Sequence, residues 1–104
     1  MDKRHFMYVL EPLGFSPPDV LTETQQRIAS AHYDYLKRLT ADDVVVLAGR
    51  TEGEEMGIAV LETDTEESAR DIMENDPAVK HGLMRATLYP YRLALLRGAP
   101  RPEA

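Results

Sequence analysis

The sequence predicts an α+β fold of the ferredoxin-like type, in which one antiparallel sheet carries two helices on the same face. Three observations support this prediction. Short apolar runs rich in β-branched and aromatic residues occur at four places along the chain. Two longer amphipathic segments with capping residues lie between them, which gives the order strand, helix, strand, strand, helix, strand. The chain has 104 residues and no cysteine, so it fits one domain that folds without disulfides.

The first strand and the first helix are expected in the N-terminal part of the chain. Residues 5–10 form a compact apolar and aromatic run, and the segment Glu11–Gly14 breaks it with a proline and a glycine. Asp19 or Thr22 can cap the helix that follows, because their side-chain oxygens accept from free backbone N–H groups. Apolar residues at helical spacing predict that this helix continues to about Thr40.

The next segment predicts a hairpin of two strands. Val44–Ala48 is continuous and mostly β-branched, which is typical of a strand buried on both sides or nearly so. Gly49 and Arg50 are expected to end that strand. The second strand of the pair covers residues 56–62, where acidic residues bound the apolar ones. A polar turn is the simplest connection between the two.

The remaining elements are a helix and a long last strand. Thr65 is the expected N-cap, and the helix must end before Pro77, because proline disfavours helical geometry at the preceding residue. An irregular stretch through Gly82 follows. Leu83–Leu96 is expected to form the final strand, with Pro90 at an edge position or a bulge because it cannot donate to a ladder.

The predicted sheet contains more apolar residues than one helix-covered face can hide. A sheet left bare on its other face would expose an apolar patch, and such patches mark interfaces. The sequence therefore predicts a homodimer that stacks two sheets face to face. The residues that exceed the capacity of one face are Tyr8, Val9, Met56, Ile58, Tyr89, Tyr91, Leu93 and Leu95.

Composition excludes several classes of function. The formal net charge of −6 argues against a nucleic-acid partner, which needs a concentrated basic face. No apolar run is long enough to span a membrane, and the absence of cysteine is compatible with a cytoplasmic location. The histidines show no metal-ligand spacing and no cofactor motif is present. We expect a single domain over residues 1–96 and a flexible tail over residues 97–104.

Two polar residues interrupt the apolar sides of the two helices. His32 lies between Ile28 and Leu36, where helical spacing predicts an apolar residue, and Asp76 follows Met73 by three positions in the second helix. Two helices on one sheet face turn these sides toward each other, so His32 and Asp76 are predicted to meet. A carboxylate beside an imidazole fixes its tautomer and stabilises the imidazolium, as a general acid or base requires.

A structural interpretation of the same two residues stands beside the catalytic one. A single histidine on an apolar stripe is more often a satisfied core residue, and aspartate before proline is common in turns. Two misplaced polar residues on converging faces nevertheless favour a site. Weaker candidates for substrate binding are Gly49, through close backbone approach, Arg50, through its charge, and His81, which follows the second helix.

The sequence resembles the YciI-like, or YCII-related, family over nearly its whole length. The motifs that carry the resemblance are Arg27–Leu39, Val46–Gly49, Glu66–Arg70, Asn75–Leu83 and Tyr89–Tyr91. The chain departs from the family pattern in its C-terminal extension and at Arg50, where many relatives have proline.

The resemblance implies a dimeric α+β barrel built from ferredoxin-like protomers, with His32 and Asp76 as the characteristic residues of the family. It also implies acid–base or elimination chemistry on small molecules, because a dehydrochlorinating lyase is among the known relatives. The leading hypothesis is therefore a cofactor-free lyase or isomerase that acts on a small organic molecule. The alternative is a non-catalytic dimeric module that binds a small ligand or a partner.

Overall fold

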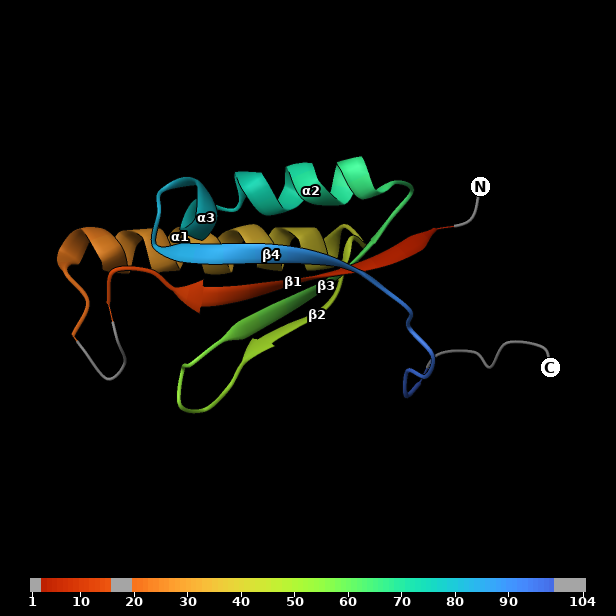
Figure 1. Ribbon diagram of the computed structural model, residues 1–104, viewed down its shortest axis with the longest axis horizontal. Helices are drawn as coiled ribbons and strands as arrows, with labels where there is room; N and C mark the ends of the chain where they lie inside the picture. The colour runs from red at the N-terminus through yellow and green to blue at the C-terminus, as the bar shows by residue number, and fades with distance from the viewer. Residues whose placement is uncertain (1–2, 16–19, 99–104) are drawn as a thin grey trace.

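The computed structural model describes residues 3–15 and 20–98, and within them a four-stranded antiparallel sheet packs against helices on one face (Figure 1). The strands are β1 (Arg4–Pro12), β2 (Val45–Arg50), β3 (Gly57–Thr63) and β4 (Met84–Tyr91). The helices are α1 (Glu23–Ala41), α2 (Glu66–Asn75) and the short α3 (Pro77–Lys80). The strand order β2-β3-β1-β4 is that of a ferredoxin-like sheet, so the predicted fold class is confirmed.

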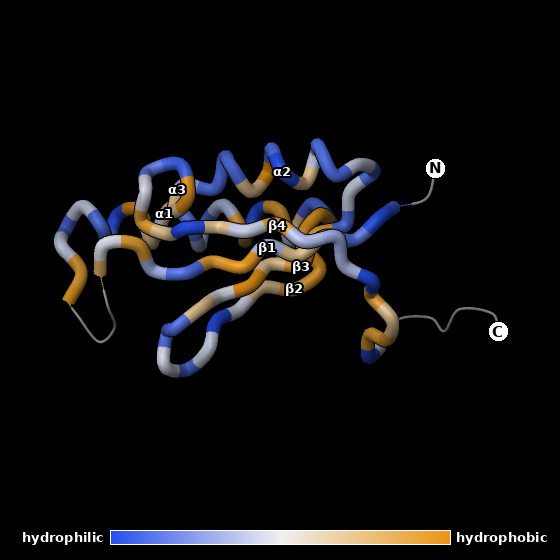
Figure 2. Tube along the Cα trace, in the orientation of Figure 1, coloured by the Kyte–Doolittle hydropathy of each residue, from blue (hydrophilic) through white to orange (hydrophobic). Residues whose placement is uncertain are grey.

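The core lies between the sheet and the helices. Alternate residues of β1 point to the helix side, and Phe6, Tyr8 and Leu10 are all buried there. Leu61 on β3 and Met73 on α2 belong to the same buried cluster. Figure 2 shows hydrophobic stretches in β1, β2 and β3, whereas α2 is hydrophilic on the turns that point away from the sheet. No helix within the described residues is long and apolar enough to cross a membrane.

Helix α1 begins where a capping box closes its first turn. The Thr22 side chain accepts from the backbone N–H of Gln25 at 3.1 Å, and the Gln25 side chain accepts from the backbone N–H of Thr22 at 2.9 Å. This reciprocal pair satisfies donors that the helix leaves free. Thr22 is therefore the N-cap, and Asp19, the other predicted candidate, lies outside the described residues.

Strand β2 differs from the prediction in both burial and length. Val45 is buried, but Leu47 and the residues that follow it in the strand are exposed. The reason is that β2 is an edge strand, and its register shifts between Val45 and Leu47. Gly49 and Arg50 belong to the strand, because they pair with Ile58 and Gly57 of β3, and the strand ends at Arg50. The predicted hairpin of β2 and β3 is confirmed.

The segments on either side of Gly82 also correct the prediction. The stretch expected to be irregular forms α3, because Pro77 occupies the first turn of a helix, where its missing N–H costs nothing. The last strand was predicted to reach Leu96 but ends at Tyr91, whose partner His5 is next to Arg4, the first residue of β1. Pro90 lies in an edge strand, as predicted. Of the predicted tail, residues 99–104 lie outside the described residues.

The face of the sheet opposite the helices is partly apolar and uncovered in this chain. Met7 on β1 lies between Val60 of β3 and Tyr89 of β4, and Tyr89 is 47% exposed. Tyr8 was counted among the residues in excess of one face, but it points to the helices and is fully buried. We call the surface formed by Met7, Val9, Ile58, Val60, Tyr89 and Tyr91 the open face.

Candidate functional site

Asp76 occupies the junction between α2 and α3, and its backbone explains its position. Pro77 restricts it to an extended conformation, with φ −60° and ψ 125°. The residue therefore ends α2 and at the same time caps α3, where its Oδ1 accepts from the backbone N–H of Ala78 at 2.9 Å. A carboxylate that looks misplaced at the end of α2 is thus well placed at the start of α3.

Three elements direct hydrogen-bond donors at this carboxylate, which is 0% exposed. The Tyr8 hydroxyl on β1 donates to Oδ2 at 2.8 Å. His32 on α1 approaches with Nδ1 at 2.7 Å from Oδ1 and 2.9 Å from Oδ2. The predicted contact between His32 and Asp76 is therefore present, and the buried charge is hydrogen-bonded on both oxygens, as burial requires.

The network fixes the tautomer of His32. Because Tyr8 and Ala78 both donate to it, Asp76 serves as the acceptor, so Nδ1 of His32 carries the hydrogen of that bond. In the neutral ring, Nε2 then holds a free lone pair. Nε2 has no hydrogen-bond partner among the described residues. In that part of the chain, every buried side-chain N or O atom has a partner. Nε2 is consequently exposed, although the His32 side chain as a whole is only 20% exposed.

Burial and the carboxylate of Asp76 raise the pKa of two tyrosines. Burial, followed by the charge of Asp76 and the hydrogen bond to it, raises the pKa of Tyr8 above the ordinary value of 10.0. Burial and then Asp76 also raise the pKa of Tyr35, while Arg38 acts in the opposite direction. Tyr35 donates to the backbone carbonyl of Ile72 at 2.7 Å. Both phenols therefore remain neutral donors near neutral pH.

Replacing Tyr8→Phe is expected to reduce the free energy of unfolding by about 1–2 kcal/mol, since a buried carboxylate loses one donor. The pH dependence should change as well. The stabilisation from a neutral Tyr8 is fully present below pH 10.0 and is lost at higher pH, where the unfolded chain ionises this phenol and the folded chain does not. Urea unfolding between neutral pH and pH 11 should therefore show a shallower alkaline loss in Tyr8→Phe. The exposed Tyr33→Phe is the matched control, and an equal slope in all three proteins would contradict the assignment.

His32 lies on the wall of a cavity of about 850 Å³. One side of α1 forms part of the wall, and β2, the β2–β3 hairpin and the ends of β1 and β4 complete it. Asp76 is beneath His32 and does not line the cavity. Most of the lining is apolar, including Leu10, Leu21, Leu36, Leu47, Met56 and Leu83. A largely apolar cavity with a few polar groups is typical of small-molecule sites.

The weaker sequence candidates separate in the structure. Gly49 and Arg50 both line the cavity with His32. His81 does not line it; this residue is exposed and follows the last turn of α3. The sequence did not identify Tyr8 as a site residue. Its alternation with Phe6 predicts that it is buried but does not predict its hydrogen bond to Asp76. The sequence also did not identify Lys37, which lies one turn after Tyr33 on α1 and lines the cavity.

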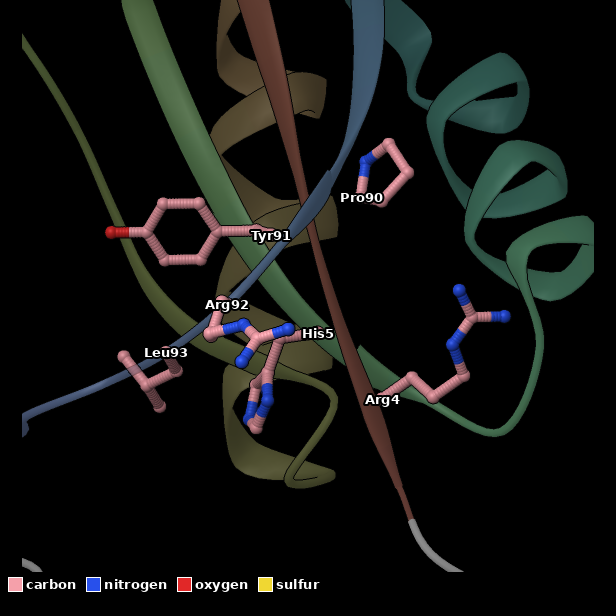
Figure 3. A pocket seen from close by; sticks show the side chains of 6 residues that line it. All are labelled: Arg4, His5, Pro90, Tyr91, Arg92 and Leu93. Atoms are coloured by element: carbon pink, nitrogen blue, oxygen red, sulfur yellow. The ribbon is translucent and has the colours of Figure 1, made fainter.

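A second cavity, of about 450 Å³, lies at the opposite end of β1 and β4 and is lined by Arg4, His5, Pro90, Tyr91, Arg92 and Leu93 (Figure 3). Its histidine, His5, is paired through Nε2 with Glu62 at 3.1 Å, so this nitrogen is not free as it is in His32. No group of three or more His, Cys, Asp or Glu residues in the described part of the chain is arranged to hold a metal ion.

Comparisons with known proteins agree with this architecture. The chain is similar to a solved structure of 5-chloro-2-hydroxyhydroquinone dehydrochlorinase from Burkholderia phenoliruptrix AC1100, in complex with 2,5-dihydroxybenzoquinone. The identity is 18%, the TM-score is 0.61, and the match covers 84% of this chain and 93% of that one. An uncharacterized protein from Thermotoga maritima, TM1266, matches at 16% identity and a TM-score of 0.47, over 88% of this chain and 100% of that one.

The family assignment rests on sequence. A comparison with curated protein sequences gives no significant match. At 18% identity, the likeness to the dehydrochlorinase establishes a shared fold. The profile of the YCII-related domain matches residues 12–90, which is most of the chain and includes both His32 and Asp76. The chain therefore belongs to the YCII-related domain family.

Proposed function

We propose that this protein is a small-molecule enzyme in which His32 transfers a proton, in a reaction of the lyase or isomerase type that side chains alone carry out. The observation that carries the proposal is that one nitrogen of the His32 ring is hydrogen-bonded and the other is free. Nδ1 is held by the buried Asp76 at 2.7 Å, while Nε2 is exposed in a largely apolar cavity. An oriented imidazole with one free nitrogen is the arrangement of a general base.

The proposed step uses only groups that line or support the cavity. The Nε2 lone pair of His32 removes a proton from a carbon next to an electron-withdrawing group of the substrate. In an elimination, the electron pair of that C–H bond forms a double bond while the leaving group departs with its own bonding pair. In an isomerisation, the imidazolium returns the proton to another carbon. Asp76 stabilises the imidazolium in both cases, because it accepts from Nδ1–H.

The fold shared with the Burkholderia protein supports this class of reaction. Removal of hydrogen chloride, the activity named for the Burkholderia protein, is an elimination that begins or ends with a proton transfer. The proposal assigns this chain to the same broad class and leaves the substrate itself open. The site residues of the proposal, His32 and Asp76, both fall within the matched domain.

The test is hydrogen–deuterium exchange on candidate substrates. Proton abstraction from carbon exchanges that hydrogen with solvent, so incubation in D2O removes the corresponding ¹H NMR signal even when no further step follows. A panel of small ketones, carboxylic acids and phenols with acidic C–H bonds is incubated with the wild-type protein. At least one compound should exchange faster than in buffer alone, and a panel without any acceleration would contradict the proposed function.

We also propose that the chain forms a homodimer through the open face. Met7 and Val9 are partly exposed and Tyr89 is 47% exposed, so this surface offers apolar side chains that a second sheet can cover. Two sheets pack face to face at a spacing of about 10 Å, and a stable interface buries roughly 800 Å² on each partner.

Met7→Glu is expected to convert the dimer to a monomer, because a carboxylate between two stacked sheets would be buried without a partner. Met7 lies on β1 between Val60 and Tyr89, at the centre of the open face. Sedimentation velocity at micromolar concentration measures the mass. Val20→Glu is the control, since Val20 is 92% exposed and outside the sheet. A monomeric wild type, or a Met7→Glu dimer, would refute this interface.

A further inference from the structure

The cavity at His32 differs in charge from the chain as a whole. The protein has 12 basic and 18 acidic residues, so a cavity with average composition would be lined by an excess of carboxylates. Among the described residues, the formally charged ones that line it are instead Lys37, Arg50 and a single acid, Glu54. Since a cation near a ligand site attracts anions and a carboxylate repels them, this reversal indicates the charge of the ligand.

Lys37 is the more informative of the two cations. It lies one turn after Tyr33 on α1, and both residues line the cavity. Lys37 has neither an ion pair nor a hydrogen bond within the described residues, whereas Lys3, for example, pairs with Asp64 at 3.5 Å. Its ammonium group is therefore available to a ligand.

Arg50 adds a second positive group with spare donors. Its Nη2 lies 3.3 Å from Oε1 of Glu54, and both side chains are largely exposed, so this contact holds the guanidinium weakly. A guanidinium has five N–H donors, and one contact leaves most of them free. Glu54 thus offsets part of the charge of Arg50 but does not occupy its hydrogen-bonding capacity.

We propose that the cavity binds a compact organic anion, a carboxylate or phenolate on an apolar carbon skeleton, with Lys37 and Arg50 as its charge partners. The apolar lining accepts the skeleton, and a volume of about 850 Å³ lies in the range of small-molecule sites. The inference rests on the proposed function only where it places the reacting C–H at Nε2 of His32. Binding of the anion itself requires no catalysis. Two cations at the wall of an apolar cavity attract such a molecule.

The experiment compares salicylate with salicylamide, which keeps the ring and hydroxyl but lacks the negative charge. Isothermal titration of the wild-type protein should give a dissociation constant of about 1 mM for salicylate, and salicylamide should bind about tenfold more weakly. Lys37→Gln and Arg50→Gln should each weaken salicylate binding about fivefold and leave salicylamide unchanged. The matched control is Lys80→Gln, because Lys80 is an exposed lysine of α3 that does not line the cavity.

The outcomes separate this inference from the proposed function. Equal binding of the two compounds, unchanged salicylate binding in both cavity variants, or no salicylate binding up to about 10 mM would each overturn the inference. If Lys80→Gln weakened salicylate binding as much as Lys37→Gln does, the inference would also be overturned. The effect would then come from the net charge of the protein and not from the cavity. Charge-dependent binding in a protein that exchanges no C–H bond would support the anion site and refute the proton transfer. Exchange in a protein that binds salicylate and salicylamide equally would do the reverse.

Discussion

His32→Asn is expected to slow the proton exchange of any responsive substrate by about 10²–10⁴-fold, the usual contribution of a general acid or base. The asparagine amide can place an N–H where Nδ1–H of His32 now donates to Asp76, but it has no group in the position of Nε2. The variant therefore removes the base and keeps the hydrogen bond. Exchange rates in D2O by ¹H NMR, at saturating compound, measure the loss.

The fold of His32→Asn supplies the control for that prediction. Because the hydrogen bond to Asp76 persists and the side chain is 20% exposed, we expect the free energy of unfolding to fall by less than about 1 kcal/mol. A full rate of exchange in a folded His32→Asn would eliminate His32 as the base. A large loss of stability with an unchanged rate would instead favour the structural interpretation, in which the pair only joins helix to helix.

Asp76→Asn should impair exchange by about 10³-fold or more while leaving a folded protein. The single oxygen of an asparagine can keep the bond from Ala78 N–H, and its NH2 group then faces Tyr8 or His32. An NH2 group opposite Nδ1 requires the other tautomer, in which Nε2 carries the hydrogen and cannot accept a proton. The same change of tautomer disables histidine in serine protease triads. The ¹⁵N chemical shifts of the His32 ring report the tautomer directly.

Asp76→Ala separates the structural role of this carboxylate from its chemical one. It leaves the Tyr8 hydroxyl and the Ala78 N–H without their acceptor in a fully buried position, and each stranded group costs about 1–3 kcal/mol. Asp76→Asn should therefore be clearly more stable than Asp76→Ala by urea unfolding. If the ring of His32 keeps its free Nε2 in Asp76→Asn and exchange is normal, the carboxylate does not control the tautomer.

Most of the fold was predictable because its elements are specified by residues close together in sequence. The Thr65 cap, the alternation of β1 and the break at Pro77 act over one or two turns, and all are present in the structure. Errors arose where neighbours in space decide the outcome. Val44–Ala48 has the composition of a buried strand, but β2 lies at the edge of the sheet, and edge position is not a local property.

The candidate site divides in the same way. His32 and Asp76 were predicted to meet, because each interrupts an apolar stripe and both stripes face one sheet. His81, a weaker candidate for substrate binding, does not join them: it is exposed after α3 and does not line the cavity. Tyr8 could not be assigned to Asp76, since 68 positions separate them and a tyrosine in a buried strand ordinarily indicates only packing.

By itself the sequence determined the order and type of the elements, the family, and the two polar residues that violate helical periodicity. These depend on side-chain chemistry and local backbone preference, which are written along the chain. Only the tertiary structure decided that Asp76 caps a helix while it accepts from Tyr8 and His32, that Nε2 is the free nitrogen, and that Lys37 and Arg50 line the same cavity. Those features depend on the packing of α1, α3 and the sheet against one another, and no local pattern encodes the distances that such packing creates.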